Sequence, residues 1–177
     1  MSEHPPTAGQ TVGPFFGFAL PFAGSAQLVP PNHPSAIQLV GGVFDGDDQP
    51  VPDALLEIWQ TDKNGASIQE GGSLHRDGHT FTGWGRAATD NEGRYRFTTV
   101  RPPGFIAMAV FARGLGHRLL TRVYLPTAVV DALLTTLPEP RRATLMAAEP
   151  TPGHLVFNVH LQGPRETVFL RFPNEPA

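Results

Sequence analysis

Glycines and prolines divide this chain into short apolar segments, and this spacing limits its possible folds more than any other feature. The 177 residues include 19 glycines and 19 prolines, and they stand mainly between apolar runs. Both residues favour turns, and proline lacks the amide proton that an interior ladder requires. Short apolar runs separated by turn residues are typical of a mainly β domain and not of a disordered chain.

The apolar runs predict about eight strands. Polar and apolar residues alternate in 94–100, which indicates one buried face, and the turn "DNEG" before it predicts a hairpin with 84–89. The run "FIAMAVF" (105–111) is apolar at every position, which predicts a strand covered on both faces. A two-sheet β-sandwich accommodates such a set. The expected strands are 37–44, 54–60, 84–89, 94–100, 105–111, 119–125, 155–162 and 167–172.

Two segments depart from the strand pattern. Residues 127–147 predict a small helical insert, with one helix that begins near Pro126 and Thr127 and a second over 140–147. Residues 1–35 are rich in proline and predict an extended arm. The arm includes "QTVGPFFGF" (10–18), which is unusually apolar for a terminus. No repeat or linker divides the chain, so 1–177 is expected to form one domain.

The composition excludes several classes of function. The chain has no cysteine, which rules out disulfides, zinc–cysteine sites and thiol catalysis. Its formal net charge is −3, and no basic stripe is present, so we expect no binding to nucleic acid. No apolar run approaches the roughly 20 residues that span a bilayer, and no signal-peptide layout is present. We therefore expect a cytoplasmic protein that does not enter a membrane.

The histidines do not form a metal-binding pattern. His75 and His79 are four residues apart, but in a Gly-rich polar segment that does not predict a helix. His154 and His160 are separated by six strand residues, or roughly 20 Å. The acidic residues of "DGDD" (45–48) lack the later glutamate and central glycine of a calcium loop. We expect no metal site from this chain's own residues, and a solvated turn at 45–48.

Arg113 is the charge most worth testing for function. It follows the apolar run 105–111 and precedes "GLG". Such a position suits either a strand end that reaches water or a guanidinium at the rim of a pocket that binds a carboxylate. The residues alone leave both interpretations open.

A series of motifs resembles the intradiol ring-cleaving dioxygenases, in the same order and from about Gln10 to Phe172. The superfamily pattern is carried by "LLEIWQTDKNG", "GWGRAATDNEGRYRFTTVRP", "TRVYLP", "PRRATLMA", "FNVHLQG" and "ETVFL". The motifs "TVGPFF" and "FARG" are similar to the alpha branch of the family in particular. The resemblance implies a β-sandwich, as the apolar pattern does independently.

The resemblance also implies a cofactor and a partner. The family uses non-haem Fe(III), held by two tyrosines and two histidines, and the histidines form an H-x-H motif. Alignment on "FARG" places Phe105 and Ala107 at those two positions, and neither side chain coordinates iron. Tyr95 and Tyr124 are the only tyrosines, and both match non-ligand positions. An alpha chain of this kind leaves the Fe(III) to a beta subunit and forms an obligate hetero-oligomer with it.

The activity implied is the cleavage of 3,4-dihydroxybenzoate by O2 to 3-carboxy-cis,cis-muconate, at a site between the two chains. In the family the arm of alpha reaches the substrate pocket, which implies substrate-binding roles for Thr11, Gly13 and Pro14. Arg113 matches an arginine near the substrate carboxylate. This chain would then position the substrate and exclude water but would not be active alone.

Two departures from the alpha pattern keep alternatives open. The segment between "TVRP" and "FARG" is shorter than in typical alpha chains, and Phe15 stands where a tyrosine is expected. Both changes leave room for an alpha-like subunit of an enzyme that opens another substituted catechol. A non-catalytic β-sandwich binding module of the transthyretin-like kind would explain the strands, but not "TVGPFF" or Arg113.

Overall fold

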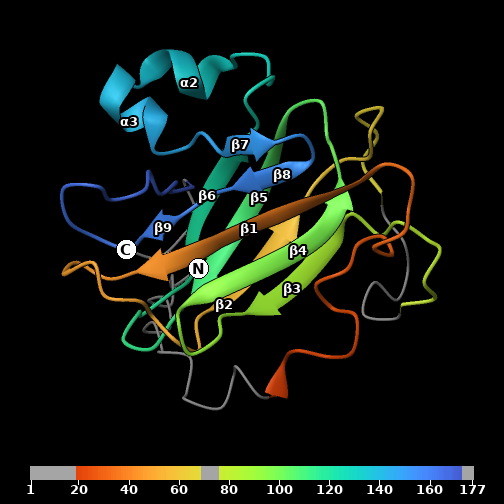
Figure 1. Cartoon of the computed structure of the whole chain (residues 1–177). Helices are drawn as coiled ribbons and strands as arrows, with labels where there is room; N and C mark the ends of the chain where they lie inside the picture. Colours follow the sequence, from red (N-terminus) through yellow and green to blue (C-terminus); the bar gives the residue numbers. More distant parts are fainter. Residues whose placement is uncertain (1–18, 69–75, 173–177) are drawn as a thin grey trace, which may run out of the picture.

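The computed structural model describes residues 19–68 and 76–172, and these form two facing β-sheets with a small helical insert (Figure 1). The mainly β two-sheet fold predicted from the sequence is thereby confirmed. The described residues contain nine strands, one more than the sequence predicted. The elements are β1 (Ala36–Phe44), β2 (Leu55–Trp59), β3 (Trp84–Ala88), β4 (Arg94–Val100), β5 (Phe105–Phe111), β6 (Leu119–Tyr124), α2 (Ala132–Thr136), α3 (Glu139–Ala143), β7 (Ala148–Thr151), β8 (His154–Val156) and β9 (Val159–His160).

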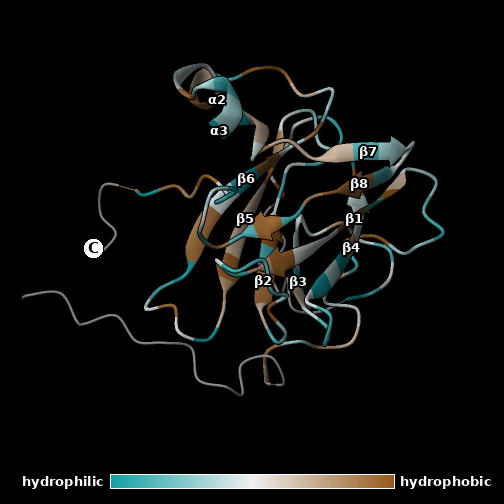
Figure 2. Ribbon diagram, turned by 60° about the vertical axis from the view of Figure 1, so that its left-hand side comes forward, coloured by the Kyte–Doolittle hydropathy of each residue, from teal (hydrophilic) through white to brown (hydrophobic). Residues whose placement is uncertain are grey.

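One sheet has the order β4-β1-β8-β7, with β9 also paired to β1, and the other has the order β3-β2-β5-β6. Most pairs are antiparallel, but β8 and β9 run parallel to β1. The core lies between the sheets and includes Leu39, Phe97, Leu56 and Ile106, none of them more than 1% exposed. Hydrophobic residues accordingly concentrate on the strands, while hydrophilic residues are common in the loops (Figure 2).

The predicted hairpin between 84–89 and 94–100 is wrong, because β3 and β4 belong to different sheets. The turn itself is tight, since the Gly93 amide donates to the Asp90 carbonyl at 2.9 Å. Beyond the turn, residues 25–26 lie between the two strands: Ser25 O accepts from the Arg86 amide, and Ala26 O accepts from the Thr98 amide. The described end of the predicted arm therefore takes the hydrogen bonds that a hairpin partner would have made.

The predicted strand 155–162 is interrupted and forms β8 and β9. At the break, the Phe157 amide donates to Val40 O, and Asn158 Oδ1 accepts from the Gly42 amide. The backbones approach so closely that a Cβ added to Gly41 would lie 1.8 Å from Phe157 O. The break is thus the place where the chain crosses β1 at a glycine, a tertiary contact that no local pattern shows.

The helical insert is shorter than predicted. Asp131 caps α2 through a hydrogen bond from the Leu134 amide to its side chain, so the helix begins at Ala132 and not near Thr127. Val129 and Val130 precede it and are 79% and 56% exposed. The second helix, α3, ends at Ala143 where the sequence predicted Ala147.

Two further predictions of strands need correction. Residues 148–151 form β7, which the sequence did not predict, and the predicted strand 167–172 contributes only an isolated bridge between Leu170 and Leu120. The Thr121 hydroxyl donates to Val168 O, which holds this final segment against β6. An isolated bridge and a side-chain hydrogen bond thus take the place of the strand pairing expected for 167–172.

The strand β5 is not covered on both of its faces. Ile106, Met108 and Val110 point into the sandwich and are at most 2% exposed, whereas the alternate residues from Phe105 to Phe111 are only half-buried. The prediction of a strand covered on both sides is therefore wrong for this chain by itself. Its second apolar face is open, and this face contributes to the candidate site.

Candidate functional site

Arg113 lies two residues beyond the end of β5, at the rim of a pocket of about 500 Å³ that Pro52, Leu115 and Leu161 also line. Its Nη2 is 3.0 Å from Asp53 Oδ2. The Arg113 side chain is 58% exposed, but that of Asp53 is only 27% exposed and its Oδ1 is buried, so the ion pair is open to water on the side of the arginine.

A second, apolar cleft of about 270 Å³ lies on the outer face of the sheet β3-β2-β5-β6. Its walls include Trp59, Trp84, Phe105, Ala107 and Phe172. Trp59 and Phe172 are 49% and 50% exposed. Phe105 and Ala107, at which the resemblance predicts the H-x-H positions of the family, present an aromatic ring and a methyl group to the cleft.

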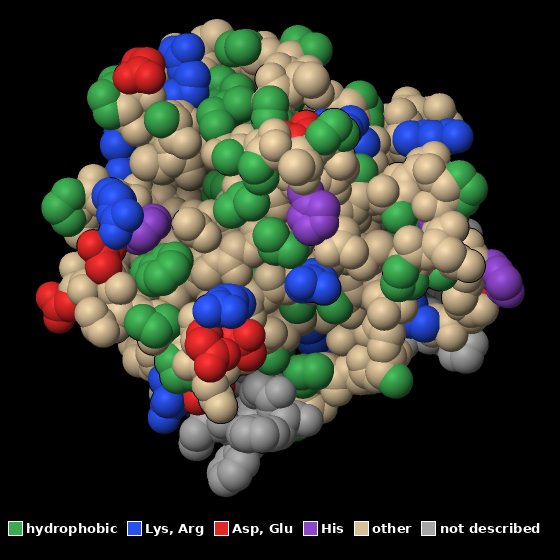
Figure 3. Space-filling view, in the orientation of Figure 1, with side chains coloured by type: hydrophobic (Ala, Val, Ile, Leu, Met, Phe, Trp, Pro, Cys, Tyr) green, Lys and Arg blue, Asp and Glu red, His purple; other side chains and the backbone are tan. Residues whose placement is uncertain are grey.

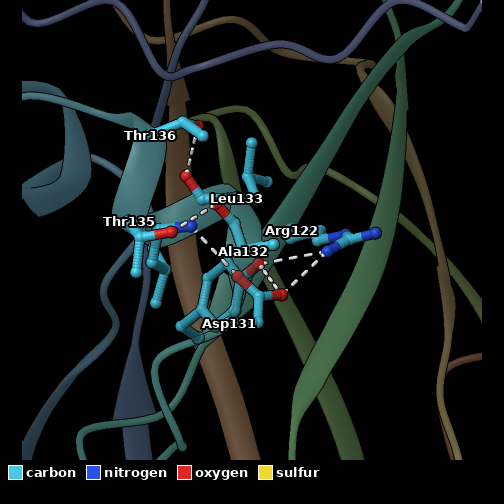
Figure 4. Close-up of polar contacts among 8 residues, drawn as sticks. Arg122, Asp131, Ala132, Leu133, Thr135 and Thr136 are labelled. Atoms are coloured by element: carbon cyan, nitrogen blue, oxygen red, sulfur yellow. Dashed lines mark hydrogen bonds and ion pairs between the residues drawn. The ribbon is translucent and has the colours of Figure 1, made fainter.

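Arg122, Tyr124 and Asp131 form a polar cluster beside this cleft (Figure 4). Asp131 Oδ2 accepts from the Tyr124 hydroxyl at 2.7 Å and from Arg122 Nη1 at 3.0 Å. The Arg122 guanidinium also lies 4.0 Å from the centre of the Phe105 ring, a cation–π contact. The cluster thus holds a positive charge directly over the ring that lines the cleft.

The pKa values in this cluster follow from its contacts. Burial raises the pKa of Tyr124 above its usual value, so the phenol stays protonated and donates to Asp131. Burial alone would also raise the pKa of Asp131, but the hydrogen bonds from the Leu134 amide and the Tyr124 hydroxyl, with the charge of Arg122, outweigh it and lower that pKa. Asp131 is therefore a carboxylate that caps α2 and ties it to β6.

The other tyrosine, Tyr95, also makes a hydrogen bond within the fold. The Tyr95 hydroxyl donates to the Phe157 carbonyl at 2.6 Å inside the sandwich. Burial raises the pKa of Tyr95 far above its usual value, so a phenolate is strongly disfavoured at this position. Both tyrosines are thus protonated donors with oxygen partners, which is the opposite of what a tyrosinate ligand of iron requires.

Among residues 19–68 and 76–172, no group of three His, Asp or Glu side chains is arranged to hold a metal ion. His160 stacks on Phe44 and lies 3.4 Å from Asp48, and burial lowers its pKa. His154 is on the neighbouring strand and belongs to no such group. His75, one of the pair at four-residue spacing, lies outside the described residues. The donors among the described residues therefore do not fit the family's iron.

The predicted substrate contacts of the arm, Thr11, Gly13 and Pro14, lie outside the described residues. The arm is described from Ala19 onward, and there it packs on the chain's own sheets: Leu28 and Val29 are 1% and 3% exposed. Arg86 Nη1 donates to Leu20 O at 2.9 Å, which fixes the point from which residues 1–18 depart.

The sequence analysis missed Trp59, Trp84 and Arg122 as parts of a site. A signal for Trp59 was present, since it is an exposed aromatic residue at the end of a strand. Nothing local marks Arg122, whose partners Phe105 and Asp131 come from an antiparallel neighbour and from a helix cap.

Surface charge gives no sign of a polyanion-binding face in the view that we show. Basic and acidic side chains are scattered across it with both signs interspersed (Figure 3). In the part of the chain that the structure describes, no helix has the length and apolarity required to cross a bilayer.

Comparison with known proteins places these observations in a family. Residues 32–114 match the family described as Dioxygenase. The chain is 35% identical to the protocatechuate 3,4-dioxygenase alpha chain of Burkholderia cepacia, over 92% of this chain and 95% of that one, and 34% identical to the alpha chain of Pseudomonas putida, over 95% and 97%. It is 31% identical to the beta chain of B. cepacia, over 63% of this chain and 54% of that one.

The solved structures agree with the sequence relatives. The dioxygenase domain of a carbohydrate-binding fusion protein from Streptomyces sp. SirexAA-E superposes with a TM-score of 0.54, at 26% identity over 78% of this chain and 87% of that one. The chain belongs to the intradiol dioxygenase family, whose members use non-haem iron. Within the family its similarity extends over nearly the full length of the protocatechuate 3,4-dioxygenase alpha chains. The resemblance predicted from the motifs is confirmed.

Proposed function

We propose that this chain is the non-iron-binding alpha subunit of a protocatechuate 3,4-dioxygenase. In this proposal a beta subunit holds Fe(III), and the two chains together form the site where O2 cleaves 3,4-dihydroxybenzoate to 3-carboxy-cis,cis-muconate. The observation that carries the proposal is the match over nearly the whole length of two alpha chains, whereas the match to a beta chain covers 63% of this chain. The protein would be a single-domain cytoplasmic chain in an obligate alpha–beta assembly.

The side chains of the described residues support a role without iron. Phe105 and Ala107 offer no donor atom at the H-x-H positions, and Tyr95 and Tyr124 are protonated and hydrogen-bonded to oxygen. The contribution of this chain would be to orient the substrate, to place positive charge at the substrate carboxylate and to exclude water.

Arg113 is the residue that we assign to the substrate carboxylate. It is exposed, it lines a pocket, and its guanidinium keeps an open side at which a substrate carboxylate can bind. We assign Thr11, Gly13 and Pro14 to the wall of the same pocket, because the proline fixes the shape of the arm and the glycine lets the backbone approach the ring.

The proposal is tested by expressing this chain alone and with a beta-type partner from the same source. We expect iron and 3,4-dihydroxybenzoate-dependent O2 uptake only in the complex, with one iron per alpha–beta pair. Iron and turnover in the isolated chain would contradict it. Cleavage of another substituted catechol in preference to 3,4-dihydroxybenzoate would support the alternative that the shortened segment between "TVRP" and "FARG" leaves open.

The role of Arg113 is tested in the same complex by the variant Arg113→Ala. The loss of a charge-assisted hydrogen bond of about 1.5–3 kcal/mol is expected to raise KM for 3,4-dihydroxybenzoate by about ten- to a hundredfold. Oxidation of catechol, which has no carboxylate, should change little. The matched control is Arg94→Ala, which removes an exposed arginine on β4. Equal increases in KM for 3,4-dihydroxybenzoate and for catechol would contradict the assignment of Arg113 to the substrate carboxylate.

A further inference from the structure

Gln162, two residues beyond β9, lines the same pocket of about 500 Å³ as Arg113. Its side-chain amide carries two donor protons and an acceptor oxygen. No hydrogen bond among the described residues involves this amide, and the residue is exposed. The pocket therefore contains a neutral polar group that the fold itself does not use.

The position of the Gln162 side chain is determined by a glycine on the facing turn. A Cβ added to Gly46 would lie 2.8 Å from both Cγ and Nε2 of Gln162, so the side chain lies flat against the bare backbone of Gly46. The neighbouring Leu161 amide donates to Phe44 O at 2.9 Å, which ties the segment after β9 to the end of β1. Gln162 is thus held in the pocket by backbone pairing and by the absence of a side chain at Gly46.

The charged groups of the pocket are already partly engaged. Asp53 Oδ2 lies 3.0 Å from Nη2 of Arg113 and occupies one side of the guanidinium. Asp45 also lines the pocket, and its Oδ1 accepts from two backbone amides of its own turn at 2.9 Å each. A carboxylate that enters the pocket has two oxygens to satisfy and only the open side of Arg113 to bind. The unused amide of Gln162 supplies a further donor.

We propose that Gln162 is a substrate-binding residue whose side-chain amide donates to the aromatic carboxylate that Arg113 binds; this inference rests on the proposed function. A neutral donor suits a pocket that also contains Asp45 and Asp53, because a second cation there would pair with these acidic side chains instead of the substrate. The two donors together would select an aromatic ring that carries a carboxylate over one that does not.

The test measures KM and kcat in the alpha–beta complex with Gln162→Ala and Gln162→Glu in this chain. Loss of the hydrogen bond in Gln162→Ala should raise KM for 3,4-dihydroxybenzoate by about two- to tenfold, with kcat and iron content unchanged. Glutamate has the shape of glutamine but repels a carboxylate, so Gln162→Glu should raise KM by about tenfold or more. The KM for catechol, which lacks the carboxylate, should change by less than about twofold in both variants.

The matched control is Gln49→Ala. Its side chain donates to Asp47 O on the neighbouring turn and does not line the pocket, so this variant should keep the wild-type KM. Because Gln162 is exposed, its replacement is not expected to impair folding.

A second variant displaces Gln162 without replacing it. The added methyl group of Gly46→Ala would collide with the Gln162 side chain and should raise KM for 3,4-dihydroxybenzoate by about two- to tenfold. Gly104→Ala adds the same methyl group where no atom lies within 4 Å, and it serves as the control. Neither glycine has a positive φ, so alanine is compatible with both backbones.

A double variant shows whether the two donors bind the same carboxylate. In the Arg113→Ala background, Gln162→Ala should raise KM by a smaller factor than in the wild type, because the carboxylate is no longer held beside the amide. The proposal is overturned if Gln162→Ala leaves KM unchanged, if Gln162→Glu behaves as the wild type, or if catechol is affected equally. A wild-type complex that does not act on 3,4-dihydroxybenzoate refutes the proposed function and this inference with it, whereas an active wild type with unaffected Gln162 variants refutes this inference alone.

Discussion

The two faces of β5 have nearly the same apolar sequence but very different surroundings. Ile106, Met108 and Val110 face the other sheet and are at most 2% exposed. On the opposite face, Phe105, Ala107 and Ala109 line a cleft and are half-buried. Apolar residues on the inner face are explained by the core of this chain. Those on the outer face have a role that the isolated chain does not fully account for.

The difference separates the residues that hold the sandwich together from those that are free to vary around the cleft. The inner face determines whether the sandwich folds, because every side chain there packs against the opposite sheet. On the outer face, Phe105 and Ala107 line the cleft and are half-buried, so we expect substitutions there to cost the fold less.

The largest loss of stability is expected from a substitution on the inner face of β5. Ile106→Ala should lower the free energy of unfolding by about 2–5 kcal/mol, because it leaves a cavity between the sheets. The control is Leu120→Ala on the outer face, which lines the cleft and should cost less than half as much. Urea unfolding of the two variants measures both. Equal losses would mean that the outer face is as well packed as the inner one.

An intermediate effect is expected at the polar cluster beside the cleft. Asp131→Ala removes the cap of α2 and the partner of Arg122 and should cost about 0.5–2 kcal/mol at pH 7. Because the pKa of Asp131 is lower in the folded state than its usual value near 3.9, its contribution is complete above that value and is lost as pH falls through the lower folded pKa.

The wild type should therefore lose more stability than Asp131→Ala when the pH is lowered from 6 to 2. Urea unfolding of both proteins across this range measures the difference, in which the effects of all other carboxylates cancel. Parallel curves would show that Asp131 is not a stabilising carboxylate in the folded chain.

The smallest loss of stability is expected from Trp59, one of the two half-exposed aromatic residues of the cleft. Trp59→Ala should change the free energy of unfolding of the isolated chain by less than about 1 kcal/mol, since 49% of the residue is already exposed to solvent. Thermal or urea unfolding measures this loss. A loss above about 2 kcal/mol would show that the outer face stabilises the fold as the inner face does.

Local patterns in the sequence were sufficient for most strands. The alternation in 94–100 and the apolar run 105–111 correspond to β4 and β5 residue for residue. The same patterns gave wrong predictions where contacts with distant segments determine how the strands pair. The turn "DNEG" connects two sheets because residues 25–26 lie between β3 and β4, and strand 155–162 breaks where it crosses Gly41.

The residues of the candidate site also differ in whether the sequence alone reveals them. Arg113 was recognisable because it follows an apolar strand and matches a family motif, and it does line a pocket. Arg122 was not recognisable, since its contacts with Phe105 and Asp131 depend on strand pairing and on the cap of α2. The roles of Thr11, Gly13 and Pro14 stay predictions, because those residues lie outside the described structure.

The sequence by itself determined the class of fold and the family, since both depend on residue type and order. That Phe105 and Ala107 stand at the iron-ligand positions of the family motif stays a prediction. The tertiary structure alone decided which face of β5 is covered, which strands pair and where the arm is anchored. Residue type sets what a side chain can do. Packing between distant segments determines whether a strand face is buried. It also determines which charges meet, as Arg86 and Glu57 do across 29 residues of sequence.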